Sequence, residues 1–241
     1  MISRDSKRPR RERARGAAKE PGSSQRSRKR SRSYHHGDLR RALLEAAVAI
    51  VHERGSDAVT LREVARRVGV SQMAPYHHFV DKEALLAAVA EQGFQELTAV
   101  MIGRIERLSS PIERLKATCP AYVHFAVTHP SEFKVMFGGA LADFKSHPSL
   151  LAASEHAFGV LMTCVEECQR AGLLGTAPSW DLAIALWSGA HGLASLWIDG
   201  PIRKGCPKTS DVGRLAEFVA TTLERGVVTK PVRRPRALGK R

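Results

Sequence analysis

The feature that most constrains this chain is the stretch of residues 57–86, which carries the start and stop signals of two short helices in quick succession. Thr60 and the glutamate three residues later have the spacing of a reciprocal capping box, so a helix is predicted to begin directly after Thr60. Gly69 ends that helix, and Ser71 is a suitable N-cap for a second one. Two short helices joined by a glycine turn predict a helix-turn-helix, whose second helix fits the major groove of DNA.

A proline stands inside the second helix of this motif. Proline costs about 3 kcal/mol in a helix interior but little in the first turn. Pro75 is the fourth residue after Ser71, so it removes at most the first intrahelical hydrogen bond. A short, partly 3₁₀ helix is therefore predicted, and not a broken one.

A set of residues in and around this motif agrees in order and spacing with a known signature: Thr60, Ala65, Gly69-Val70-Ser71, Tyr76, His78-Phe79, Lys82 and Leu85-Leu86. The run resembles the DNA-binding region of TetR-family transcriptional repressors, and the similarity covers about residues 34–90. It implies a three-helix DNA-binding domain over residues 34–86. Its supporting helix is predicted to be capped by Asp38 and to end at Gly55.

The motif and the resemblance together assign DNA contacts. Gln72 has an amide that can pair bidentately with adenine, and Met73 or Ala74 can meet a thymine methyl group. The resemblance implies phosphate contacts from residues at the start of the motif and after it. The complete set of expected DNA-binding residues is Tyr34, Thr60, Ser71, Gln72, Met73, Ala74, Tyr76, His77 and Lys82.

The formal net charge of +14 is concentrated at the two ends of the chain. Residues 1–33 contain 13 Lys or Arg and 3 acidic residues, and residues 230–241 contain 6 Lys or Arg and no acidic residue. The middle of the chain is nearly balanced, with 19 Lys or Arg and 21 acidic residues. Such segments bury too little apolar surface to offset the entropy of ordering, so we expect a disordered basic arm and a disordered basic tail. The arm either contacts phosphates and the minor groove or is simply solvated.

The rest of the chain predicts an all-α fold, because it contains helical patterns with Gly or Pro breaks and no strand-like alternation. Residues 87–229 are assigned to a helical ligand-binding and dimerisation domain. The segment 179–199 is apolar nearly all round, which indicates burial on more than one side. With the last helix, 211–226, it predicts a four-helix dimer seam. The Trp187-x-x-x-His191-Gly192 pattern also resembles the WHG-type regulatory domain of one TetR branch.

The resemblance to TetR-like regulators further implies a small-molecule pocket between the helices of this second domain. Large apolar and aromatic side chains with few polar groups are typical of such a site. They favour a lipophilic or aromatic effector over a phosphate or a sugar, although the same residues could simply form the core. The expected pocket residues are Tyr122, Phe125, Phe133, Met136, Phe137, Phe158, Met162, Trp187 and His191.

Several classes of protein are disfavoured by the sequence. It contains no nucleophile elbow, no phosphate-binding glycine loop and no His-Glu-x-x-His motif. We therefore expect no catalytic residues, no metal site and no cofactor. It has no transmembrane run and no secretory signal, from which a cytoplasmic location and no membrane partner are expected. Cys164 and Cys168 lie one helical turn apart, where core packing competes with a metal- or thiol-sensing role.

These observations favour one interpretation and leave two open. The favoured one is a homodimeric transcriptional repressor, not an enzyme, that binds a palindromic operator and is released by a small lipophilic or aromatic effector. The first alternative is a constitutive DNA-binding protein without an effector. The second is a thiol- or metal-sensing regulator that acts through Cys164 and Cys168.

Overall fold

The computed structural model describes residues 36–141, 143–205 and 211–227, which all belong to one compact unit of the chain, His35–Arg241. Apart from an isolated β-bridge at Leu174, this part of the chain is helical or irregular, which confirms the all-α prediction. Its elements are α1 (His36–Arg54), η1 (Ser56–Ala58), α2 (Leu61–Val68), η2 (Ala74–His77), α3 (Lys82–Ile105), α4 (Pro111–Thr128), α5 (Pro130–Phe137), η3 (Phe144–Ser146), α6 (Pro148–Arg170), α7 (Ser179–Ile198), α8 (Pro201–Gly205) and α9 (Val212–Val227).

Both ends of α2 and the start of α3 lie at the capping residues that the sequence predicts. The Thr60 hydroxyl accepts a hydrogen bond from the amide of Glu63, and Asp81 accepts from the amide of Ala84, so α2 and α3 both begin with a side-chain cap. Gly69 closes α2 in the left-handed conformation, with φ of 81°. A residue without a Cβ adopts this conformation at little cost, which explains the glycine at this turn.

Three details of the capping differ from the sequence-based expectations. The Glu63 carboxylate does not return to the Thr60 amide, because the guanidinium groups of Arg54 and Arg66 occupy it. Ser71 is not a side-chain N-cap, since the 3₁₀ helix η2 begins three residues later and Ser71 contributes only its carbonyl, to the Ala74 amide. α1 starts before Asp38, which therefore lies in its first turn.

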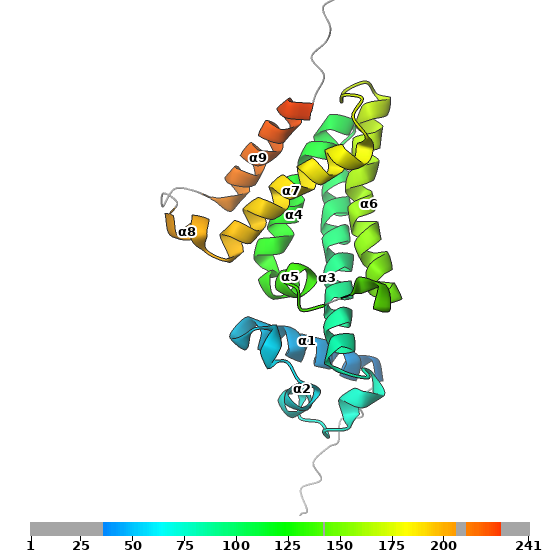
Figure 1. Cartoon of the computed structure of the whole chain (residues 1–241), viewed down its shortest axis with the longest axis vertical. Helices are drawn as coiled ribbons and strands as arrows, with labels where there is room; N and C mark the ends of the chain where they lie inside the picture. The colour runs from blue at the N-terminus through cyan, green and yellow to red at the C-terminus, as the bar shows by residue number, and fades with distance from the viewer. Residues whose placement is uncertain (1–35, 142, 206–210, 228–241) are drawn as a thin grey trace, which may run out of the picture. The chain divides into compact units, whose positions relative to one another are not determined.

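Figure 1 shows α3 as the long helix that runs from the neighbourhood of α1 into the remaining bundle. It packs against α1 at one end and against α4, α5 and α6 along its length. α7 and α9 pack against each other and both against α4. α4 continues through Pro120, which is buried, so the proline neither ends the helix nor marks its start.

The core is continuous between the two predicted domains. One cluster of buried apolar side chains runs from α1 through α3 to α5, α7 and α9, and a smaller one lies between α4, α6 and α7. Close approach of α3 and α5 depends on Gly93, where a Cβ would lie 2.5 Å from the sulfur of Met136. The boundary predicted at residue 86 therefore falls inside α3, and the division at that point remains a prediction.

None of the helices in the described residues is both long enough and apolar enough to cross a membrane.

Candidate functional sites

The segment from Ser71 to Phe79 has both exposed and buried large side chains. Met73 is 65% exposed and Tyr76 is 47% exposed, although large apolar and aromatic side chains are more often buried. Pro75 is buried, and its carbonyl accepts hydrogen bonds from two following amides. Phe79 is 4% exposed and lies 5.6 Å from the guanidinium carbon of Arg40. Pro75 and Phe79 thus fix a short turn on which Gln72, Met73, Tyr76 and His77 are exposed.

Most arginines of the helix-turn-helix region are already engaged within it. Arg54 and Arg66 both donate to Glu63, at 2.6 Å and 2.8 Å, and Arg67 forms a bidentate pair with Glu53. The hydrogen bonds from Arg66 and Arg54 lower the pKa of Glu63 to about 2. These exposed pairs connect α1 with α2 and orient the motif, and each contributes modestly to stability.

Two cations at the edges of the motif, Arg62 and Lys82, form no ion pair with any residue that the structure describes. Arg62 is exposed on α2 and has no ion pair among the described residues. Lys82, in the first turn of α3, donates to the carbonyl of Asp57 at 3.2 Å, which holds its ammonium group beside η1. A lysine held in this way keeps two further N–H groups for another acceptor.

Most of the described DNA-binding candidates lie in the segment 71–77, whereas Thr60 stands at the start of α2 and Lys82 in the first turn of α3. Thr60, Ser71, Gln72, Met73, Tyr76 and His77 are exposed, whereas Ala74 and Lys82 are half-buried. Tyr34 and the basic arm lie outside the described residues. The exposed group combines hydroxyl, amide, thioether, phenol and imidazole side chains, several of which can donate hydrogen bonds to phosphates or bases.

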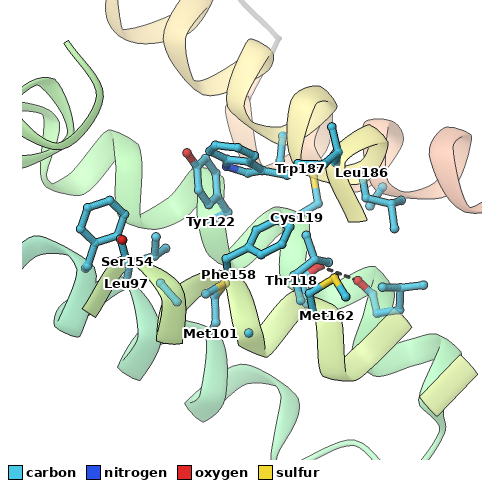
Figure 2. A pocket seen from close by; sticks show the side chains of 18 of the residues that line it. Leu97, Met101, Thr118, Cys119, Tyr122, Ser154, Phe158, Met162, Leu186 and Trp187 are labelled. Atoms are coloured by element: carbon cyan, nitrogen blue, oxygen red, sulfur yellow. Dashed lines mark hydrogen bonds between the residues drawn. The ribbon is translucent and has the colours of Figure 1, made fainter. Parts of the chain in front are cut away.

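The second site is a cavity of about 700 Å³ inside the bundle. Its wall is formed by α3, α4, α6, α7 and α9, with single residues from α5 and η3. Figure 2 shows Phe158 of α6 between Met101 of α3 and the rings of Tyr122 and Trp187. The lining residues are Phe94, Leu97, Met101, Leu115, Lys116, Thr118, Cys119, Tyr122, Phe137, Phe144, Ser154, Glu155, Ala157, Phe158, Gly159, Leu161, Met162, Trp180, Ile184, Leu186, Trp187, Ala190, Ala220, Leu223 and Glu224.

The nine expected pocket residues divide between this wall and the packing behind it. Those that line the cavity are Tyr122, Phe137, Phe158, Met162 and Trp187. The other four do not line it: Phe125 stacks on His129, Met136 packs near Gly93, and Phe133 and His191 stack on each other at 5.4 Å. Large aromatic residues in this region of the bundle thus line the cavity at some positions and form the packed core behind it at others.

His191 and Tyr122 connect the cavity wall to the packing behind it. The Tyr122 hydroxyl oxygen lies 2.8 Å from Nδ1 of His191. Rings of Phe133, Phe137 and Trp187 surround the imidazole at 4.9 to 5.7 Å. Burial lowers the pKa of His191 and raises that of the Tyr122 hydroxyl, so this pair is uncharged near neutral pH.

The face of α3 that lines the cavity was not among the expected pocket residues. Phe94, Leu97 and Met101 recur at helical spacing, which predicts an inward stripe but does not distinguish a cavity wall from a filled core. The same holds for Ile184 on α7 and Leu223 on α9. No sequence signal separates these two cases, because the empty volume depends on how five helices are spaced.

The cysteines that the structure describes are buried and reduced. Cys119, Cys164 and Cys168 are free thiols, and burial raises the pKa of Cys119 to about 12 and of the other two to about 11. Within the described ranges, no three His, Cys, Asp or Glu side chains are close enough together to hold a metal ion.

An exposed helix-turn-helix joined by one long helix to a helical bundle is the architecture of a transcriptional regulator. Family comparisons agree with this class. Residues 43–89 match the family described as bacterial regulatory proteins, tetR family, and residues 115–223 match the Tetracyclin repressor-like C-terminal domain. The chain belongs to the TetR family of transcriptional regulators.

Curated relatives match a limited part of the chain. The HTH-type transcriptional regulator BetI of Rhizobium meliloti is 35% identical over 78 residues, and its Brucella melitensis biotype 2 counterpart is 33% identical over 89 residues. These alignments cover 32% and 37% of this chain. They cover only 38% and 44% of the relatives' own lengths, so they do not reach most of either regulator.

Solved structures extend the similarity over most of the chain. A protein of unknown function from Rhodococcus sp. RHA1 is 33% identical, covers 82% of this chain and 100% of its own, and has a TM-score of 0.71. The fatty acid degradation regulator FadR from Bacillus halodurans is 16% identical with a TM-score of 0.62, and covers 78% of this chain and 95% of its own. At that identity, the second similarity concerns the fold alone.

Proposed function

We propose that this protein is a homodimeric transcriptional repressor that binds a palindromic operator and leaves it when a small lipophilic or aromatic effector occupies the cavity. The observation that carries the proposal is the course of α3. Its first turns pack against α1, and further along the same helix Phe94, Leu97 and Met101 line the cavity. A molecule that contacts these three side chains bears directly on the helix that holds the DNA-binding domain.

We assign the DNA-binding domain to residues 34–86 and the ligand-binding and dimerisation domain to residues 87–229. Gln72 would read an adenine, with Met73 and Ala74 against thymine methyl groups. Tyr34, Thr60, Ser71, Tyr76, His77 and Lys82 complete the proposed DNA contacts. The exposure of Gln72 and Met73 on a turn anchored by buried residues supports these roles.

The dimer would form through α7 and α9. These helices pack on each other, and each keeps a large apolar side chain in solvent, with Leu196 48% exposed and Phe218 64% exposed. Burial of such side chains against a second copy is favourable, at roughly 25 cal/mol for each Å² of apolar surface. A twofold axis then presents two recognition segments, which fit successive major grooves only at a separation of roughly 34–36 Å.

An effector would act by changing this separation. It can shift the equilibrium only by its differential affinity for the two arrangements, and a coupling of about 1–3 kcal/mol gives a 5- to 150-fold loss of operator affinity. By reciprocity, operator DNA weakens effector binding by the same factor.

Selection of bound sequences from a random DNA pool tests the DNA-binding part. We expect a palindrome with an adenine in each half-site that Gln72→Ala no longer distinguishes, at a cost of about 1–3 kcal/mol for that base pair. Lys82→Ala should weaken all sequences alike and reduce the salt dependence of binding. Gln95→Ala, on an exposed part of α3, is the matched control. If the selected DNA molecules share no common sequence, the result would instead favour a constitutive DNA-binding protein.

Titration of a cavity-filling compound into the operator complex tests regulation. A ligand that binds the free protein should release the operator, and Trp187→Ala should blunt this release while leaving operator affinity without ligand intact. If a compound binds in the cavity without any change in operator affinity, the repressor is not regulated through this cavity.

A further inference from the structure

The charged side chains that line the cavity are few and do not balance. Among the described residues of the wall, one basic and two acidic side chains occur, Lys116, Glu155 and Glu224, so the formal charge of the wall is −1. Burial raises the pKa of Cys119 and of Tyr122, and both stay neutral. The remaining lining residues are apolar, apart from two hydroxyl groups that donate to carbonyls of their own helices.

The single cation of the wall is already paired. Nζ of Lys116 lies 3.4 Å from Oε2 of Glu224, and the two side chains are 34% and 20% exposed. An anionic ligand that engaged Lys116 would leave the Glu224 carboxylate partly buried and close to a second negative charge. Removal of one partner from a partly buried ion pair is costly, because the other charge loses its compensation.

Glu155 differs from both of these residues. It is exposed at the edge of the cavity and has neither a hydrogen bond nor an ion pair with any residue that the structure describes. Phe158 follows it one turn later on α6, with its ring 5.0 Å from Trp180 and 6.0 Å from Trp187. A cavity wall that carries both a carboxylate and aromatic rings is suited to an organic cation, which the rings attract through their negative faces.

We propose that the cavity selects lipophilic organic cations over anions of the same size, with the positive charge held by Glu155 and the ring of Phe158. The apolar body of such a ligand would lie among the side chains of α3 and α7. A cation placed there breaks no existing ion pair and neutralises the formal charge of the wall. The regulatory consequence of this selectivity rests on the proposed function, whereas the selectivity itself does not.

A pair of ions with the same shape and opposite charge tests the selectivity. Tetraphenylphosphonium and tetraphenylborate differ in the sign of their charge, and isothermal titration calorimetry measures the binding of each to the full-length protein. Raised salt screens the basic ends of the chain, which would otherwise attract the borate. We expect the phosphonium to bind about 10-fold more tightly, from one carboxylate contact and an aromatic contact. Tighter binding of the borate, or no binding of either ion, overturns the proposal.

Two glutamine variants on α6 locate the charge effect. Glu155→Gln should weaken phosphonium binding by about 5-fold and leave borate binding unchanged or tighter. Glu166→Gln is the matched control, because Glu166 is equally exposed on the same helix but does not line the cavity. Equal changes in the two variants, or no change in Glu155→Gln, would show that Glu155 does not select the charge.

Operator release is measured separately, in the same samples, so that the two proposals can fail independently. Binding of the phosphonium that depends on Glu155 but leaves the operator bound would retain this inference and overturn the proposed function. Operator release by an uncharged lipophilic compound, with no preference between the two ions, would retain the proposed function and overturn this inference.

Discussion

The helix-turn-helix region and the bundle around the cavity place their large side chains in opposite ways. In the first, Met73, Tyr76 and Val80 are 65%, 47% and 79% exposed, so folding does not depend on them. In the second, Phe125 and Phe133 are at most 4% exposed, and their neighbours form the cavity wall. Met73 and Tyr76, which are proposed to bind DNA, can therefore vary with little loss of stability, whereas the side chains around the cavity are proposed to serve folding and ligand binding together.

The polar groups of the two regions differ in the same sense. In the motif, Glu63 is 21% exposed, but its partners Arg54 and Arg66 are 49% and 73% exposed. In the bundle, Arg114 reaches Glu167 at 3.1 Å from α4 to α6, and both side chains are about one-third exposed or less. Arg54 and Arg66 keep more of their side chains in water than Arg114, so substitution of these two arginines should be tolerated better.

The largest expected effect is the loss of a buried ring from the bundle. Phe133→Ala removes contacts with Tyr122, Phe137 and His191 and should lower the free energy of unfolding by about 3–5 kcal/mol. Met73→Ala, in the motif, should change it by about 0.5 kcal/mol or less. Urea denaturation monitored by circular dichroism measures both. A small loss in Phe133→Ala would mean that this ring faces a ligand site and not the core.

The second effect concerns the buried thiols. With the pKa of Cys164 and Cys168 raised from 9.0 to about 11, the thiolate fraction near pH 8 falls by about 100-fold. Alkylation by iodoacetamide, read by peptide mass spectrometry, should be slower in the native protein by at least this factor than in urea. Native alkylation at the unfolded rate would contradict the burial of these residues and favour the thiol-sensing alternative.

A smaller effect is expected from the cap of α2. Thr60→Ala removes the hydrogen bond that the hydroxyl accepts from Glu63 at 3.1 Å and should cost about 1 kcal/mol of stability. Thr60→Ser keeps this bond and should stay within a few tenths of a kcal/mol of the original protein. The measurement is made without DNA, so that a proposed phosphate contact does not contribute. Equal stability of both variants would show that the arginine pairs of Glu63 hold the helix by themselves.

The smallest effect is a pH dependence in the bundle. Burial lowers the pKa of His191 below its unfolded value of 6.5, so the unfolded chain binds the proton more readily. Stability is therefore complete above pH 6.5, declines as the pH falls through the window between the two pKa values, and levels off below the folded one. His191→Gln should lose this component, seen as a shallower change in unfolding free energy between about pH 7.5 and pH 5.5. A decline that is the same in His191→Gln would assign it to other groups.

The sequence by itself determined the motif and the all-α class, because the signals involved are local. Thr60, Gly69 and Asp81 act on amides and dihedral angles within a few residues of themselves, and the structure places all three at helix ends. Helical periodicity likewise predicted the inward stripe of α3 without information about what that stripe faces. The 3₁₀ character around Pro75 followed from the geometry of one residue.

The tertiary structure alone decided which inward-facing side chains border an empty volume. Phe133 and Phe137 lie four residues apart in one helix and both pack against His191, yet only Phe137 lines the cavity. It also decided that Glu63 pairs with Arg54, which lies nine residues earlier, in place of completing the capping box. Both outcomes depend on the distance and angle between helices that are remote in the chain, and periodicity within one helix carries no information about that spacing.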